Sequence, residues 1–260
     1  MKPRIVIITG DKPHMNYFIS RISSEFEVVS VFYFKLWERP ISRTFEYFRS
    51  KEFRSRNTII SSIAYDILGE SNIGYSYADE KLQNYSINSS IPLNHCEDIN
   101  SQKVIESIKE LNPDLVFCHG GPIYKSGIIN CAKTVINFHS GISPNYRGAH
   151  SHLFAYIDDN SDFIGGTLMK LNAKIDGGDI ISKCKPKLNN TDTPNTIFLK
   201  IMHSGCDLVI DYLRNYDNYK QVEKQSVEGK YTKSSDFNFL ILFRYYYRRM
   251  IGLKTIDRYK

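Results

Sequence analysis

The sequence predicts an α/β fold with an open, mostly parallel sheet, and three apolar segments support this. Ile5 to Ile8, Val28 to Phe34 and Asp114 to Cys118 are short runs rich in β-branched and aromatic residues, as is typical of buried strands. A helical pattern separates the first two, which indicates the opening of a βαβ unit. At 260 residues, the chain suits one such domain with an appendage, or one domain and a small second one.

A polar loop at residues 10–16 follows the first predicted strand and leads into a helix at 17–22. A loop in this position commonly receives an anionic group on the free N–H groups of the helix, so Asp11 and Lys12 are candidate substrate-binding residues. The loop lacks the spaced glycines of a dinucleotide fingerprint or a P-loop, which excludes both motifs. An ordinary turn between strand and helix is an equally weighted alternative.

The next part of the chain is polar and rich in tyrosine, and we expect a helical insertion at about 35–75. The segment 91–93 is interpreted as the end of a strand. A helix then follows at 104–111, with its cap at Asn100 or Ser101.

Polar side chains follow two further apolar segments. The run 134–136 leads to Asn137 and His139, and the run 166–171 leads to Asp176. This pattern predicts two strands that deliver an amide, an imidazole and a carboxylate to their carboxyl ends, where open α/β sheets usually hold ligands. These groups can donate a hydrogen bond, move a proton and hold positive charge. Acyl transfer to an amine without a covalent enzyme intermediate needs these functions.

The order of these residues resembles the signature of the folate-dependent formyltransferases. The family pattern is Asn-x-His, a proline, an aromatic residue and often Arg-Gly, then a Gly-Thr strand and an Asp-x-Gly turn. The matching residues are Asn137, His139, Pro144, Tyr146, Arg147, Gly148, Gly166, Thr167, Asp176, Gly177 and Gly178. The resemblance covers about residues 1–185. It implies a Rossmann-like, open, twisted, mostly parallel sheet with helices on both faces, plus the insertion and a short C-terminal extension.

The resemblance also implies roles for individual residues. Asn137, His139 and Asp176 would be catalytic, and 10-formyltetrahydrofolate would be the cosubstrate. The implied cofactor contacts are His119, Gly120, Gly121, Pro122, Ile123, Ile142 and Ile175. A Gly-Pro turn that merely connects a strand to a helix is the alternative for 119–125. The acceptor contacts would be Tyr146, Arg147 and His150, although Arg147 has a structural role in its loop as the favoured alternative.

Three histidines close in sequence raise the question of a metal site. His150 and His152 could place two imidazoles near His139, but no cysteine or carboxylate lies at ligand spacing nearby. The family that the sequence resembles uses no essential metal, and we expect none here. Instead, we expect His150 and Ser151 to cap a helix at 153–157.

Cysteine usage and the N-terminus favour a cytoplasmic protein. The five cysteines are odd in number, lie far apart and form no Cys-x-x-Cys pair, which is typical of reduced thiols. The apolar run at residues 5–8 is too short for a signal peptide, and no segment approaches the length of a transmembrane helix.

We expect a catalytic domain at 1–185 and a C-terminal helical extension at 186–260, with a helix from about 193 to 213. The tail from 239 to 260 has six basic residues against one acidic residue, a net charge of +5. It is interpreted as a terminal helix that packs on the domain or on a second subunit. The alternative is a basic amphipathic helix on an anionic membrane surface.

The expected acceptor is a nucleotide-linked amino sugar for surface polysaccharide synthesis. We expect the long C-terminal domain of the tRNA enzymes to be absent, and the shorter glycinamide enzymes lack an insertion like 35–75. The charge of +6 is unevenly distributed, which does not favour a nucleic-acid partner. The alternatives are 10-formyltetrahydrofolate hydrolysis, glycinamide-ribonucleotide formylation, or a non-catalytic membrane- or partner-binding protein that keeps the fold.

Overall fold

The computed structural model describes residues 2–36, 67–68, 73–218, 222–225, 229–233 and 236–253. Most of the helical insertion expected at about 35–75 lies outside these residues, and so does the end of the basic tail. All five cysteines are free thiols. Within the described ranges, no helix has both the length and the apolar character that crossing a membrane requires.

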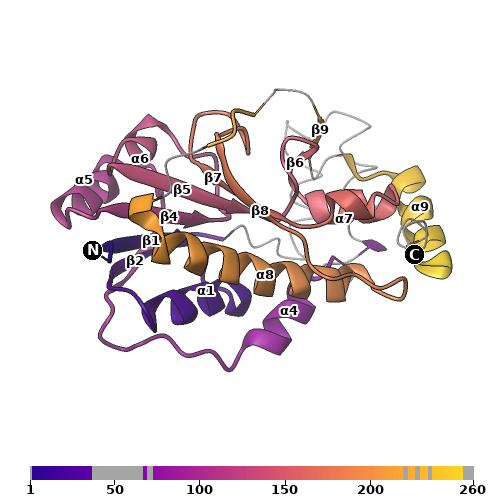
Figure 1. Ribbon diagram of the computed structural model, residues 1–260, viewed down its shortest axis with the longest axis horizontal. Helices are drawn as coiled ribbons and strands as arrows, with labels where there is room; N and C mark the ends of the chain where they lie inside the picture. Colours follow the sequence, from indigo (N-terminus) through magenta and orange to yellow (C-terminus); the bar gives the residue numbers. More distant parts are fainter. Residues whose placement is uncertain are drawn as a thin grey trace, which may run out of the picture.

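A seven-stranded sheet forms the centre of the described part, in the order β3-β2-β1-β4-β5-β7-β8 (Figure 1). The first five strands in that order are parallel, whereas β7 is antiparallel to both of its neighbours. The open, mostly parallel sheet predicted from the sequence is therefore confirmed. The strands are β1 Ile5–Thr9, β2 Val28–Phe34, β3 Leu93–Cys96, β4 Leu115–His119, β5 Thr134–His139, β7 Gly166–Lys170 and β8 Ile180–Cys184.

Helices cover both faces of this sheet, as predicted. Helices α1, α4 and α8 lie together on one side (Figure 1), where they share the larger apolar core, while α5 and α6 contribute to a second core on the other face. The helices are α1 Pro13–Ser23, α4 Tyr75–Leu82, α5 Gln102–Glu110, α6 Ser126–Ile129, α7 Ser151–Ile157, α8 Pro194–Arg214 and α9 Phe239–Ile251, with short 3₁₀ turns at Ser161–Phe163 and Tyr216–Asn218.

Two element boundaries differ from the sequence expectation. Helix α1 begins at Pro13 rather than near residue 17, because proline fits the first helical position, where no N–H partner is needed. Strand β3 begins at Leu93, where the sequence pattern predicted that a strand would end. Ser101 occupies the N-cap position of α5, as expected, although its side chain makes no capping hydrogen bond.

The direction of β7 corrects a further expectation. Its pairing with β5 places Thr167 beside His139 and Lys170 beside Ile136, so the two strands run in opposite directions. The carboxyl end of β7 is therefore at the opposite end of the sheet from the carboxyl end of β5. Asp176 reaches the polar edge only because the loop between β7 and β8 returns towards His139.

A small second sheet joins two segments that are far apart in sequence. Strand β6, Tyr146–Gly148, pairs in parallel with β9, Lys230–Thr232. The buried hydroxyl of Thr232 donates to the carbonyl oxygen of Ala149 at 2.7 Å, and the carbonyl oxygen of Arg147 lies 3.1 Å away as an alternative acceptor. This ladder holds the segment that follows the His139 loop.

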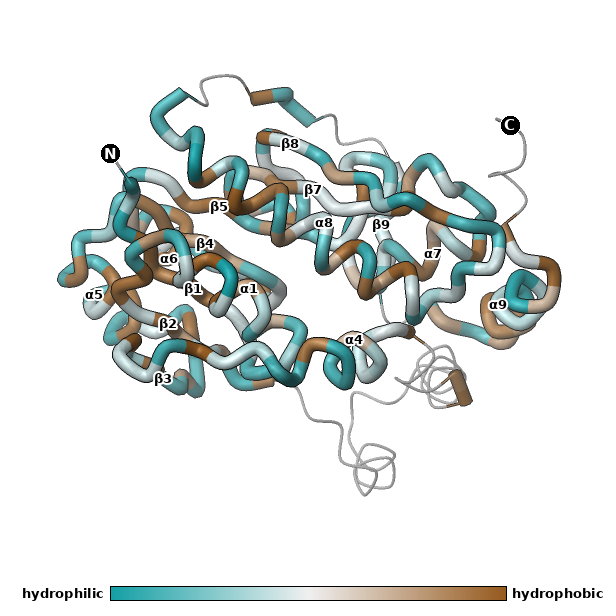
Figure 2. Tube along the Cα trace, turned by 60° about the horizontal axis from the view of Figure 1, so that its bottom comes forward, coloured by the Kyte–Doolittle hydropathy of each residue, from teal (hydrophilic) through white to brown (hydrophobic). Residues whose placement is uncertain are grey.

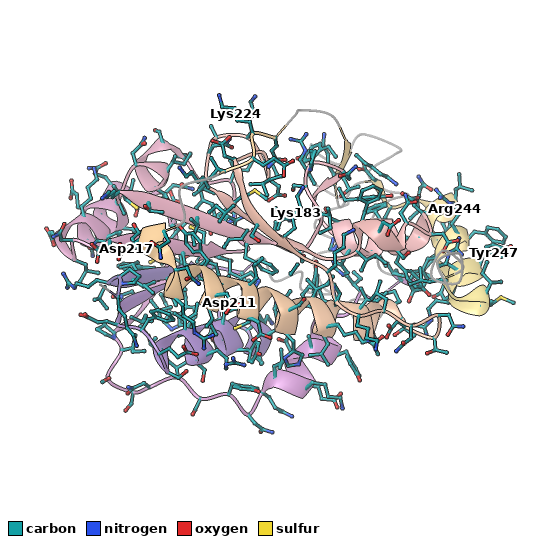
Figure 3. All side chains as sticks on the ribbon, viewed as in Figure 1. Lys183, Asp211, Asp217, Lys224, Arg244 and Tyr247 are labelled. Carbon is teal, nitrogen blue, oxygen red and sulfur yellow. The ribbon has the colours of Figure 1, made fainter. Side chains whose placement is uncertain are left out.

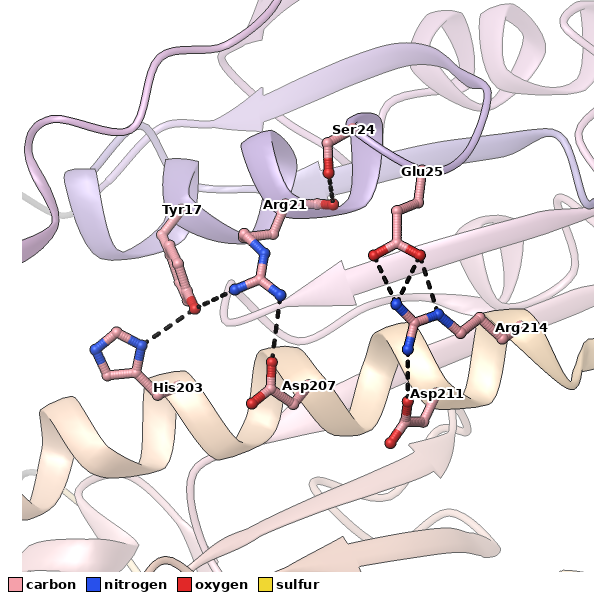
Figure 4. Close-up of polar contacts among 8 residues, drawn as sticks. All are labelled: Tyr17, Arg21, Ser24, Glu25, His203, Asp207, Asp211 and Arg214. Carbon is pink, nitrogen blue, oxygen red and sulfur yellow. Dashed lines mark hydrogen bonds and ion pairs between the residues drawn. The ribbon is translucent and has the colours of Figure 1, made fainter.

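Polar contacts join α1 to the long helix α8 (Figure 4). The guanidinium of Arg214 contacts the carboxylate of Glu25 at 2.8 Å, and that of Arg21 contacts Asp207 at 3.4 Å. These side chains are partly exposed, so each pair contributes at most about 1 kcal/mol. The apolar face of α8 belongs to the same core as β1 and β5. The expected boundary between a catalytic domain at 1–185 and a C-terminal extension at 186–260 stays a prediction.

Close packing of α8 on the sheet occurs at Gly205, opposite Phe138. A Cβ atom at Gly205 would lie 2.1 Å from the Phe138 ring, so a larger residue would force the two elements apart. Phe138 lies between Asn137 and His139 in β5, and this contact therefore supports the position of both polar side chains.

We expect Gly205→Ala to lower the free energy of unfolding by about 1–3 kcal/mol, because overpacking outweighs the gain in helix propensity. Urea denaturation would measure the change. In a double-mutant cycle with Phe138→Leu, the cost of the alanine should shrink, since the shorter side chain relieves the contact. An equal cost in both backgrounds would contradict this.

Candidate active site

The carboxyl end of β5 presents Asn137 and His139 on the same face of the sheet, because side chains two residues apart in a strand point the same way. Both side chains are buried. Strand β4 ends beside them, with His119 paired to Phe138. The polar groups therefore lie at the edge of the sheet where parallel α/β proteins hold ligands.

Asp176 lies next to His139, with its Oδ2 atom 3.4 Å from the imidazole Nδ1. The same oxygen accepts a hydrogen bond of 2.9 Å from the N–H of Gly148, and the Asp176 carbonyl accepts one from the Ser143 hydroxyl at 3.3 Å. Asp176 has a φ of 46°, which is uncommon for a residue other than glycine. The loop is held in a strained conformation that directs the carboxylate at the ring.

The second ring nitrogen of His139 also meets an acceptor. Its Nε2 atom lies 3.2 Å from the carbonyl oxygen of Tyr146. A carboxylate and a carbonyl can only accept hydrogen bonds, so each ring nitrogen of His139 faces an acceptor. This arrangement fixes the orientation of the ring beside Asn137.

The side-chain amide of Asn137 is available for a ligand. It makes no hydrogen bond with the residues that the structure describes, although only a small part of the side chain is exposed. A buried amide without a partner is costly, so a ligand oxygen that accepts its N–H would be favoured.

Thr167 organises the loop between these residues, and sequence reasoning gave it no role. Its fully buried hydroxyl donates to the carbonyl of Gly141 at 2.7 Å and accepts from the N–H of Ser143 at 3.0 Å. Only glycine fits at 141, since a Cβ there would lie 2.5 Å from the His139 ring. The Gly-Thr pair of the motif was the available signal for this role.

The loop after β4, which contains the expected cofactor contacts, is a tight turn. Gly120 and Gly121 have φ values of 70° and 111°, and the Tyr124 hydroxyl donates to the Gly120 carbonyl at 2.8 Å. Asn100, which the sequence analysis considered only as a helix cap, donates to the Ile123 carbonyl at 3.1 Å. The side chain of Ile123 is 64% exposed and therefore available to a ligand.

The remaining predicted cofactor contacts differ in accessibility. Pro122 and Ile175 are exposed, whereas Ile142 is buried and packs near Gly165. His119 is almost completely buried. Their contacts with a cofactor stay predictions.

The expected anion contact at the start of α1 lacks free donors. The backbone N–H of His14 donates to Asp79 at 3.0 Å, and those of Met15 and Asn16 donate to the Lys12 carbonyl. Pro13 has no N–H. Asp11 and Lys12 are exposed and stay predictions as substrate contacts.

The three predicted acceptor contacts after the His139 loop have different environments. The Tyr146 hydroxyl is occupied by Asp158 and Asn160, so this side chain points away from the site. His150 has a φ of 57° and contacts the Tyr75 hydroxyl at 3.0 Å. Arg147 is only 9% exposed, and its guanidinium has no partner among the described residues.

Histidine side chains also form an aromatic cluster beside the site. The His119 ring contacts Phe18, Phe117 and Phe138, and desolvation, followed by the nearby His14, lowers the pKa of His119 to about 3. Desolvation likewise lowers the pKa of His152 to about 4. The described part of the chain contains no group of three or more His, Cys, Asp or Glu residues arranged to hold a metal ion.

The fold and this geometry define an α/β protein with a polar site at the carboxyl edge of its parallel strands. A family model described as formyl transferase matches residues 74–213, more than half of the chain. The chain belongs to the formyl transferase family.

Individual relatives agree with this assignment. A methionyl-tRNA formyltransferase from Nitratiruptor sp. is 30% identical over 148 residues, which cover 56% of this chain and 48% of the relative. The chain thus spans about half the length of the curated relatives it matches. A sugar N-formyltransferase from Shewanella sp. has a similar fold, with a TM-score of 0.61 and 19% identity, covering 94% of this chain and 88% of that one.

A further structural neighbour was solved with ligands. The formyltransferase PseJ from Anoxybacillus kamchatkensis, in complex with UDP-4,6-dideoxy-4-formamido-L-AltNAc and tetrahydrofolate, has a TM-score of 0.51 and 17% identity. The match covers 96% of this chain and 94% of that one.

The burial of His119 has a consequence for stability at low pH. The unfolded chain binds a proton at this residue near pH 6.5, whereas the folded chain binds it only near pH 3. The free energy of unfolding should therefore fall as the pH decreases between these values, because the unfolded state binds more protons.

We expect His119→Phe, which suits the aromatic surroundings, to reduce this pH dependence by an amount that approaches about 1.4 kcal/mol per pH unit below pH 6.5. Denaturant titrations at several pH values from about 7 to 5 would measure it. His152 should continue to contribute to the slope in the variant. Equal slopes in both proteins would argue against a buried, neutral His119.

Proposed function

We propose that the protein transfers a formyl group from 10-formyltetrahydrofolate to the primary amine of a small acceptor, a nucleotide-linked amino sugar used in surface polysaccharide synthesis. The amide of Asn137, which has no hydrogen-bond partner among the described residues, lies in the same strand as His139 of the His139–Asp176 pair, and this arrangement carries the proposal. Free thiols at all five cysteines support a reducing, cytoplasmic setting.

The three side chains match the charges that develop in the reaction. As the amine attacks the formyl carbon, negative charge collects on the formyl oxygen and positive charge on the nitrogen. Asn137 donates its N–H to that oxygen, an interaction worth about 3 kcal/mol in comparable sites. His139 stabilises the same oxygen when protonated.

Asp176 completes the proton balance. It attracts the proton that leaves the attacking nitrogen, directly or through water, and it supports the charged form of His139. When the tetrahedral centre collapses, the bond from the formyl carbon to the folate nitrogen breaks, and that nitrogen takes up a proton.

Two observations support an anionic, nucleotide-linked acceptor. The structural match to the Shewanella sugar N-formyltransferase extends over nearly the whole chain. The PseJ structure contains a UDP-linked formamido sugar together with tetrahydrofolate. The buried guanidinium of Arg147 lies against Gly177, next to the proposed catalytic carboxylate, and no described residue provides it with a counter-charge. A phosphate of the acceptor would provide one.

Formylation of methionyl-tRNA is the second candidate, because the curated relatives are methionyl-tRNA formyltransferases. An assay of tetrahydrofolate release from 10-formyltetrahydrofolate separates the candidates. Acceptor-dependent release with one of a panel of nucleotide-linked amino sugars would support the proposal. Tetrahydrofolate release only with methionyl-tRNA or glycinamide ribonucleotide would identify that compound as the acceptor instead. Release without any acceptor would indicate hydrolysis.

We expect Asn137→Ala to reduce kcat by about 100-fold to 1000-fold, because the developing oxyanion loses a donor. Asp176→Asn keeps the shape of the side chain but removes its charge, and it should also lower kcat strongly. Steady-state formation of the formylated sugar would measure both effects. Thermal unfolding serves as the control for folding. An unchanged kcat in either variant would show that the substituted residue has no catalytic role.

We expect Arg147→Gln to raise the KM for the nucleotide-linked acceptor at least about tenfold while changing kcat much less, because it removes the counter-charge of a phosphate. The matched comparison is a sugar acceptor without the diphosphate. For this acceptor, the KM should be nearly the same in the wild type and in the variant. Equal losses for both acceptors would indicate that Arg147 only supports its loop.

A further inference from the structure

Helix α9 is apolar on two opposite sides. One side, with Leu242 and Tyr245, packs into the large core beside α7. The other side is exposed and consists of Phe239, Leu240, Phe243, Tyr246, Tyr247 and Met250, which we call the outer face of α9. A large apolar stripe exposed on a helix is typical of a surface that another molecule covers.

The outer face is a continuous stripe. Its members follow one another at intervals of one or three residues, which places them on one side of a helix. Phe243 near the centre is 68% exposed and Met250 at the end is 85% exposed. Tyr247 points away from the body of the molecule (Figure 3), and Figure 2 shows α9 at one end of the described fold.

The charges beside this stripe are largely neutralised within the chain. Arg244 contacts Asp158 at 2.8 Å and Arg248 contacts Asp159 at 3.1 Å, so two of the three arginines of α9 have carboxylate partners. Arg249 donates to the Tyr245 hydroxyl at 3.3 Å. Binding to an anionic membrane depends on basic side chains whose charge is available to lipid headgroups. The described part of α9 fits that occupant poorly.

We propose that the outer face of α9 is the interface of a homodimer. An uncharged stripe can meet its own copy across a two-fold axis without juxtaposing like charges. Phenylalanine, tyrosine and methionine are also the residue types enriched at such interfaces.

The exposed area of the outer face of α9 is large enough for an interface with a second copy of the chain. Six large side chains with about half or more of their surface exposed offer on the order of 700 Å², close to the roughly 800 Å² that each partner contributes to a standard interface. Phe243, near the middle of the stripe, would lie close to the two-fold axis.

Sedimentation velocity on the full chain tests the proposal. The wild type should sediment as a dimer, with twice the 30.1 kDa mass of the chain. Phe243→Glu places a charge in the centre of the interface and should weaken dimerisation at least about 30-fold. Met250→Glu, at a more exposed position, should act in the same direction with less risk to folding.

Leu93→Glu is the matched control, since Leu93 is an exposed apolar residue, at 46%, in β3 at the opposite end of the fold (Figure 2). It should leave the dimer unchanged, and circular dichroism with thermal unfolding should show that all three variants fold. A monomeric wild type, or a dimer that survives both α9 substitutions, would overturn the proposal.

The same proteins should be centrifuged with phosphatidylserine and phosphatidylcholine vesicles. We expect the wild type to remain in the supernatant with both lipids. A monomer that pellets with phosphatidylserine vesicles and is released by Phe243→Glu would assign the outer face to a membrane surface instead.

Discussion

The imidazole of His139 lies between two acceptors that come from different parts of the chain, and the candidate site depends on this arrangement. Strand β5 supplies the ring, the carbonyl of Tyr146 in β6 meets one nitrogen, and Asp176 from the loop after β7 meets the other. The carboxylate also accepts the N–H of Gly148, so the three segments fix one another. The site is a product of tertiary structure, and it forms only when all three segments are in place.

Sequence reasoning was most successful where burial determines the pattern. The runs that became β1, β2, β4 and β5 are apolar because both faces of a parallel sheet are covered, and a capping residue with helical spacing indicated α5 and α8. The direction of β7 was not predictable, since a short apolar strand has the same pattern in either orientation. For the same reason, the meeting of His139 with Asp176 was expected from the ordered motif rather than from strand geometry.

Partners far apart in sequence account for the remaining differences. Asp79 takes the N–H of His14, so this backbone donor at the start of α1 is already occupied. Asp158 accepts a hydrogen bond from the Tyr146 hydroxyl and pairs with Arg244. Part of the positive charge of the basic tail is therefore neutralised within the chain. A count of charges identifies basic segments, but only the fold shows which of these charges are already paired. The contacts of Thr167 and Asn100 were hidden because a single hydroxyl or amide leaves no periodic signal.

The parallel pairing of β6 with β9 sets the order in which the protein can mature. Residues 146–148 leave the ribosome long before residues 230–232, yet they share one ladder, and Gly148 contacts the carboxylate of the site. A nascent chain that already contains Asn137, His139 and Asp176 therefore still lacks the strand that holds their supporting segment. Synthesis must pass residue 232 before the site can be complete, and until then the edge of β6 that pairs with β9 is open to wrong partners.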